Sequence, residues 1–224
     1  VRRLRQAYRF AEHGISRDLL PERAAAVRVL AFVPVFADVL ARAIYPVYAG
    51  TMARAAGLLE PGLGAAIALA AFMAGVAAAL PLGAGLSLRL GRRTVYIAGA
   101  LLAAAALAST GFAVDYVSLC AARLATGAGY ALMFASCQGY VCDNASPAER
   151  PAAMATLLGA MLLADLCAPL IGAVLAGHAG TQIVFTAASG LLSGVAALGF
   201  ALLDNSNAQP MVTVLPTLRR PPAN

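Results

Sequence analysis

Four ionisable side chains lie inside stretches that are otherwise apolar enough to be buried in lipid. Asp38 and Arg42 are four residues apart in one stretch, and Arg123 and Asp165 lie in two later ones. A single unpaired charge in a lipid interior costs several kcal/mol, so such residues pair with one another or face a water-filled path. The four charges sum to zero. They are either structural ion pairs that offset the cost of burial, or part of a polar cavity that binds substrate or protons.

The composition predicts a membrane protein. Of 224 residues, 61% are hydrophobic and 12% are charged, whereas soluble domains carry about 25% charged residues. The net charge of +6 does not indicate nucleic-acid binding, because the arginines form no basic face with interleaved aromatic residues. The sequence has no nucleotide-binding loop, no HExxH and no CxxC spacing among its four cysteines. We therefore expect no enzyme, no cofactor and no metal site.

Six apolar stretches are long enough to cross a bilayer, for which about 20 residues are needed. Because lipid leaves helices as the solution for runs of this length, the fold class is all-α, a polytopic membrane protein with six transmembrane helices. The spans are expected near residues 29–50, 63–86, 94–114, 116–141, 152–177 and 183–203. Residues 28–203 form this domain, 1–27 are an interfacial amphipathic helix or a linker from an upstream domain, and 204–224 are a disordered tail.

The arginines predict the orientation. Arginine and lysine gather in the cytoplasmic loops of membrane proteins. One side of the predicted membrane holds only Arg54. The other side holds thirteen arginines: Arg2, Arg3, Arg5, Arg9, Arg17, Arg23, Arg28, Arg89, Arg92, Arg93, Arg150, Arg219 and Arg220. Both termini are therefore expected in the cytoplasm.

The intramembrane charges are predicted to share one depth. At about 1.5 Å per residue, Asp38 lies about 15 Å and Arg42 and Asp165 about 20 Å from the cytoplasmic side, while Arg123 enters about 10 Å from the opposite side. This arithmetic nominates Asp38 and Asp165 as partners of Arg123, with Arg42 as a competitor. Gln138, on the helix of Arg123, is a further candidate for hydrogen bonding.

Neighbouring polar and small residues suggest supporting roles. Tyr130, and Tyr45 and Tyr48 on the first span, could add hydrogen bonds to the charges. For Tyr45 and Tyr48 the favoured alternative is a place in the outer aromatic belt. Small residues at Gly127 and Gly129, and at Gly190 and Gly194, predict close helix contacts. Pro46, Pro81 and Pro169 lie within spans, where proline can kink a helix. The Ser146, Pro147 and Glu149 pattern predicts a capped start of the fifth span.

Three motifs resemble those of the major facilitator superfamily. The loop GAGLSLRLGRRTVY resembles the signature between its second and third helices, in which small residues and an aspartate precede a basic residue and Gly-Arg-Arg. Leu88 stands where that family has its aspartate. The matching residues, to which the resemblance gives a gating role, are Arg89, Gly91, Arg92 and Arg93.

The other two motifs lie on the fourth and fifth spans. RLATGAG, from Arg123 to Gly129, resembles the Arg-x-x-x-Gly-x-Gly motif whose arginine is implicated in proton transfer. CAPLIGAVLAG resembles the Gly-Pro-rich motif of exporters, with Pro169 and Gly172 retained. Residues 129–176 also resemble a bacterial subgroup in which the transporter follows a sensor-type membrane and linker region. This resemblance implies that the protein lies in a bacterial inner membrane.

The resemblance implies an N-terminal half, with six helices, of a transporter built from two such halves. A proton-coupled antiporter that exports small organic compounds is the expected function. The expected partners are the lipid bilayer, a small-molecule substrate, protons, and a second six-helix half that is either a missing C-terminal half or another copy. The alternative is a membrane sensory or interaction domain that binds a ligand without moving it across the bilayer.

Overall fold

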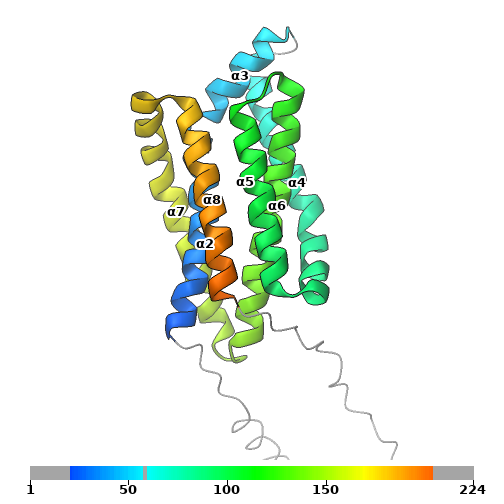
Figure 1. Ribbon diagram of the computed structural model, residues 1–224, viewed down its shortest axis with the longest axis vertical. Coiled ribbons are helices and arrows are strands. Elements are labelled where there is room, and N and C mark those ends of the chain that lie inside the picture. The colour runs from blue at the N-terminus through cyan, green and yellow to red at the C-terminus, as the bar shows by residue number, and fades with distance from the viewer. Residues whose placement is uncertain (1–20, 58–59, 204–224) are drawn as a thin grey trace, which may run out of the picture.

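The computed structural model describes residues 21–57 and 60–203, which form seven helices and no strand. The all-α prediction is confirmed. Figure 1 shows a bundle of roughly parallel and antiparallel helices. The helices are α2 (Pro21–Arg42), α3 (Tyr45–Ala55), α4 (Pro61–Leu90), α5 (Arg92–Gly111), α6 (Tyr116–Asn144), α7 (Arg150–Ala179) and α8 (Thr181–Leu202).

Five of the six predicted spans are confirmed as single helices. By length and composition, α4 to α8 can each cross a membrane. The first predicted span, 29–50, is not one helix, because a turn at Ala43 and Ile44 separates α2 from α3. Pro46 lies in the first turn of α3 and has no N–H to continue the ladder of α2. The helix α2 is not among these five helices, and its crossing of the membrane stays a prediction.

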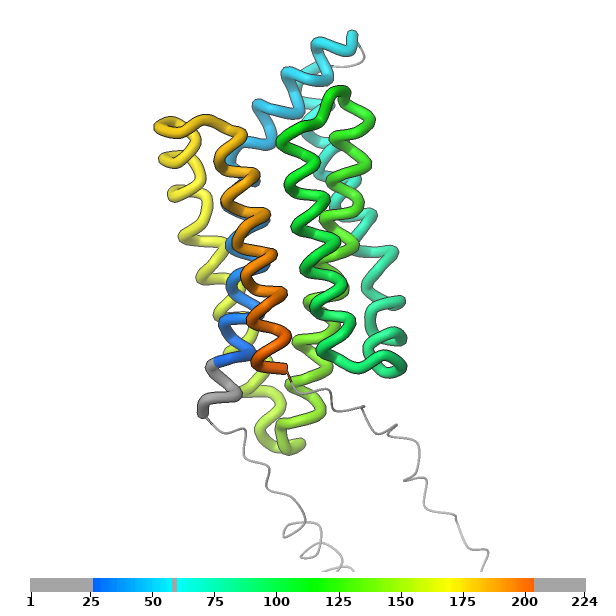
Figure 2. Tube along the Cα trace, in the orientation of Figure 1, coloured from blue at the N-terminus to red at the C-terminus, as the bar shows by residue number. Residues whose placement is uncertain are grey.

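The helices pack as two groups of three. α4, α5 and α6 form one group, and α2, α7 and α8 form the other; α5 packs on α8, and α2 on α6. α2 begins and α8 ends at one end of the bundle, which we call the termini end, while α3 leans outward at the far end (Figure 2). The predicted domain limits at 1–27 and 204–224 lie largely outside the described residues.

Glycines let α6 approach its neighbours closely. A Cβ at Gly127 would overlap the carbonyl of Phe72 on α4, and one at Gly129 would reach the carbonyl of Gly99 on α5. The close packing predicted for these two glycines is confirmed. The same prediction is wrong for Gly190 and Gly194, because a Cβ at either would meet nothing within 4 Å. The GxxxG spacing in α8 faces open space rather than a neighbouring helix.

Two helix starts show what capping does here. α6 begins with a capping box, in which Asp115 accepts the backbone N–H of Ser118 at 2.6 Å. The predicted cap at Ser146, with Pro147 as the first helical residue, is three residues early, since α7 begins at Arg150 with Glu149 as its N-cap. The Ser146 hydroxyl donates to the Glu149 carboxylate at 2.7 Å instead of accepting a backbone N–H, so residues 147–149 form a turn.

Candidate functional site

The four intramembrane charges form one alternating chain. Arg123 Nη1 donates to Asp38 Oδ1 at 3.0 Å, and Asp38 Oδ2 accepts from Arg42 Nη2 at 2.8 Å. Arg42 Nη1 in turn lies 3.6 Å from Asp165 Oδ1. The predicted pairing of Arg123 with Asp38 is confirmed, and Arg42 joins the two aspartates instead of competing for them. This charge chain joins residues of three helices: α6, α2 and α7.

Burial changes sharply along this charge chain. The side chains of Arg123 and Asp38 are 2% and 3% exposed, whereas those of Arg42 and Asp165 are 42% and 45% exposed. Asp38 and Arg42 share one face of α2 because they are four residues apart. The network therefore runs from a desolvated pair in the core to an accessible pair at the surface of the described bundle.

Two aromatic rings enclose the buried guanidinium. Arg123 Cζ lies 3.9 Å from the centre of the Tyr45 ring and 4.5 Å from that of Phe72. These cation–π contacts offset part of the cost of desolvating the charge. The placement of Tyr45 in an outer aromatic belt is wrong, because Tyr45 is buried directly after the break between α2 and α3. Tyr48 packs on Phe185 and donates to the carbonyl of Thr110 at 3.2 Å.

A cavity of about 200 Å³ adjoins the charge chain where the α2–α3 corner meets α4 and α6. Arg42 and Arg123 supply its cationic part, and the remaining wall is mostly alanine and leucine. The lining residues are Arg42, Tyr45, Pro46, Ala65, Ala66, Ala68, Leu69 and Arg123. An apolar chamber with a few convergent polar groups is the usual form of a small-molecule site.

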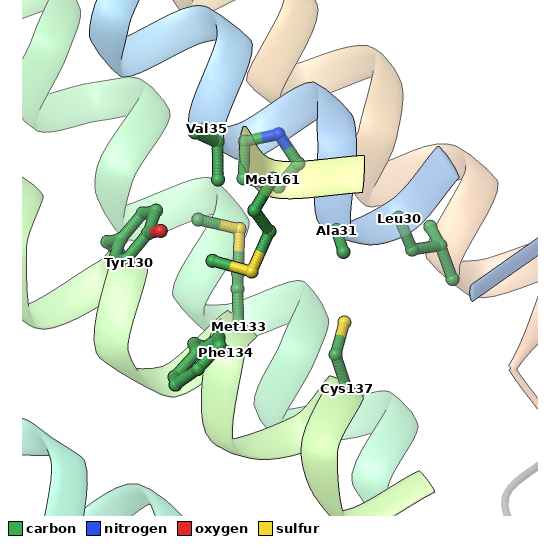
Figure 3. A pocket seen from close by; sticks show the side chains of 9 residues that line it. Leu30, Ala31, Val35, Tyr130, Met133, Phe134, Cys137 and Met161 are labelled. Atoms are coloured by element: carbon green, nitrogen blue, oxygen red, sulfur yellow. The ribbon is translucent and has the colours of Figure 1, made fainter. Parts of the chain in front are cut away.

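A second pocket, between α2, α6 and α7, is too small for an organic ligand. Its volume of about 10 Å³ is near the minimum for one water molecule. Figure 3 shows Met133 and Met161 facing each other across it, with Tyr130 and Cys137 at its sides. Tyr130 stacks with Phe134 and packs on Phe72, and the structure gives it no hydrogen bond to the four charges.

Gln138 does not join the charge chain. It lies fifteen residues after Arg123 on the continuous helix α6, which is about 22 Å along the helix axis. Gln138 was a candidate because it lies on the same helix as Arg123. The distance along that helix places Gln138 toward the other end of the bundle. Pro169 and Gly172 lie within α7 without interrupting it, and a Cβ at Gly172 would overlap the carbonyl of Leu40 on α2.

The signature loop forms a second polar cluster, at the termini end. Arg92 is buried; its Nε donates to Asp143 Oδ2 at 3.0 Å and its Nη1 to the Ser87 hydroxyl at 2.9 Å. Gly91 ends α4 and starts α5 with φ of 88°, a conformation that favours glycine. We call Ser87, Arg92 and Asp143 the Arg92 clamp, since it ties α4, α5 and α6 together.

The other residues of the signature loop stay outside the Arg92 clamp. Leu88 and Arg89 are exposed, and Arg93 stacks on Phe200 with its Cζ 3.6 Å from the ring centre. Sequence reasoning missed Ser87 and Asp143. Asp143 is an acidic residue at the C-terminal end of the fourth predicted span, on the same side of the membrane as Arg92. This position could have indicated that the two residues pair.

Comparisons with known proteins agree with this arrangement. A model of the Major Facilitator Superfamily matches residues 30–220. The MFS-type transporter ppzB of Metarhizium rileyi is 28% identical over 120 residues, which are 54% of this chain and 25% of that protein. The aligned part thus spans about a quarter of that curated relative. With five helices suited to crossing a bilayer and a match covering most of the chain, this is an integral membrane protein that belongs to the major facilitator superfamily.

Proposed function

We propose that this chain is one half of a proton-coupled secondary transporter that exports small organic compounds. The observation that carries the proposal is the charge chain, which connects the buried Arg123–Asp38 pair to the exposed Arg42 and Asp165 beside a cavity. The distribution of arginines supports cytoplasmic termini, and the resemblance of residues 129–176 to a bacterial subgroup supports a bacterial inner membrane.

In the proposed mechanism the aspartates carry the protons. A guanidinium does not lose its proton in a protein, so Arg42 and Arg123 stay cationic throughout. Protonation of Asp165 removes its attraction for Arg42, and protonation of Asp38 removes its attraction for both arginines. An ionised aspartate of the charge chain can hold a substrate that carries a cationic or hydrogen-bond-donating group, whereas protonation removes this attraction and releases the substrate. Substrate and protons would then occupy the site in alternation, which is the requirement for exchange.

A second six-helix half would complete the transport path. Large apolar side chains on α7, among them Leu162, Leu166 and Leu170, are exposed on the described bundle. Asp165 and Arg42 are exposed as well. A partner half that covered these residues would enclose the accessible end of the charge chain between the two halves.

Proton-coupled exchange can be tested in lipid vesicles that contain the full-length transporter, with both six-helix halves, and a trapped pH dye. An organic cation (ethidium), an organic anion (benzoate) and a neutral compound (chloramphenicol) are added outside in turn. We expect at least one of them to change the internal pH, and the change to vanish in D38N and D165N. R28Q, which removes an exposed arginine from α2, is the control and should behave like the wild type.

Two results would count against the proposal. A pH change that persists in both D38N and D165N would remove the aspartates from the proton path. Binding of a compound without any exchange or pH change in the wild type would support the sensory or interaction domain instead.

A further inference from the structure

A groove opens between α5 and α8 on the outer surface of the bundle at the termini end. It has a volume of about 500 Å³. Its walls are mainly apolar, and Phe200 and Leu101 are more than half exposed. The lining residues are Arg93, Thr94, Ile97, Ala98, Leu101 and Phe200. From Arg93 to Leu101 the groove follows α5 for about 12 Å, the length of several methylene groups.

One end of this groove is cationic. Arg93 has no acidic partner among the residues that the structure describes, and its Cζ lies over the Phe200 ring, 3.6 Å from the ring centre. Stacking uses the face of the guanidinium and leaves its in-plane N–H donors available, which suits two oxygens of a phosphate. Thr94, the neighbouring residue in the groove, is exposed and can add a hydroxyl.

A comparable groove at the far end carries the opposite charge. It lies between α5 and α6, has a volume of about 630 Å³, and is lined by alanines together with Ser109, Phe112 and Asp115. Both grooves offer apolar walls, but the second presents a carboxylate where the first presents a guanidinium. The two grooves therefore differ in the charge of the headgroup that they can accept.

We propose that the α5–α8 groove binds an anionic phospholipid, with its phosphate on Arg93 and its acyl chain along Leu101 and Phe200. The occupant is a lipid rather than a peptide or a second helix because the apolar part runs along the bilayer-facing side of two membrane helices, with the charge at their ends. Basic pockets between membrane helices are the usual sites for anionic headgroups. This proposal does not depend on transport or on proton coupling.

The absence of tryptophan from the sequence permits a clean fluorescence test. A98W places a single tryptophan in the α5–α8 groove, and A121W places one in the α5–α6 groove. Each variant is reconstituted into phosphatidylcholine vesicles that contain brominated phosphatidylglycerol or, at equal fraction, brominated phosphatidylcholine. Bromine quenches a tryptophan that it touches, so quenching reports which lipid occupies the groove.

For A98W we expect a roughly fivefold preference for phosphatidylglycerol, since one arginine near a membrane surface contributes about 1 kcal/mol. The preference should disappear in A98W/R93Q and remain in A98W/R93K and A98W/R28Q. A121W should show no preference for the anionic lipid. Equal quenching of A98W by both lipids, or quenching by neither because protein covers the groove, would overturn the proposal.

A measurement without tryptophan guards against misfolding of A98W. Native mass spectrometry of the unsubstituted chain with phosphatidylglycerol should show bound lipid. In R93Q the bound fraction should fall about fivefold, whereas R28Q should match the wild type. Equal lipid binding by R93Q and the wild type would contradict the assignment independently of the quenching result.

Discussion

Two buried arginines, near opposite ends of α6, are each held by an aspartate of another helix, yet their surroundings differ. Arg123 pairs with Asp38 on α2, and Arg92 on α5 pairs with Asp143 of α6. The second carboxylate oxygen of Asp38 accepts a hydrogen bond from Arg42, and Arg42 also forms an ion pair with the exposed Asp165. The second hydrogen bond of Arg92 ends on the buried hydroxyl of Ser87.

We propose that this difference separates a responsive network from a static one. In the Arg123 network every partner is charged, so a proton or ligand that arrives at Asp165 changes the balance at Arg42 and then at Asp38. The Arg92 clamp ends on a neutral group that cannot change its charge. On this proposal, an aspartate–arginine pair serves proton coupling near one end of α6 and holds helices together near the other end.

The largest effect on stability is expected for D38A. This change leaves Arg123 buried without its carboxylate, and breaking a buried ion pair costs about 3–5 kcal/mol. Unfolding of the purified chain in detergent, followed by circular dichroism, measures the free energy lost. A loss below about 1 kcal/mol would show that the two aromatic rings suffice to hold the guanidinium.

G139A should open the Arg92 clamp. A Cβ at Gly139 would overlap the guanidinium of Arg92, so Arg92 must move away from Asp143 and Ser87. We expect a loss of about 1–3 kcal/mol in unfolding free energy. G159A is the matched control, because a Cβ there meets nothing within 4 Å and replacing a helical glycine by alanine stabilises by up to about 1 kcal/mol. Equal changes in the two variants would contradict the described packing.

D165N should separate stability from function. Arg42 and Asp165 are 3.6 Å apart and more than two-fifths exposed, and exposed pairs contribute about 0–1 kcal/mol. We expect an unfolding free energy close to that of the wild type together with loss of the pH change in vesicles. A large loss of stability would place Asp165 among the structural residues.

The smallest effect concerns pH and the start of α6. The backbone N–H of Ser118, and then its hydroxyl, lower the pKa of Asp115 below its usual value. Because the folded pKa is the lower one, the cap contributes stability above the unfolded pKa of about 3.9, and this contribution is lost as the pH falls through the folded pKa. Amide exchange at the first turn of α6 should rise at acidic pH in the wild type, and less so in D115N. Identical acid responses would remove Asp115 as the titrating group.

Much of the fold and part of the site could be predicted from the sequence. Long apolar runs leave only helices, and the cost of an unpaired Arg123 required a carboxylate at its depth, which Asp38 supplies. The break at Ala43 and Ile44 was hidden because hydropathy continues through it. A tyrosine suits both an outer aromatic belt and a cation–π contact with a buried arginine. The residue type alone therefore did not show that Tyr45 packs on Arg123. Spacing alone also cannot tell which face of α8 carries Gly190 and Gly194.

The most direct test of the central claim compares D165N with D143N. Each removes the charge of one aspartate that pairs with an arginine of another helix. In the vesicle assay the quantity to measure is the number of protons moved per molecule of compound moved. We predict that D165N reduces this ratio to zero and that D143N leaves it at the wild-type value even where exchange slows. A ratio that is unchanged in D165N, or lost equally in both variants, would contradict the division between a proton-responsive charge chain and a structural clamp.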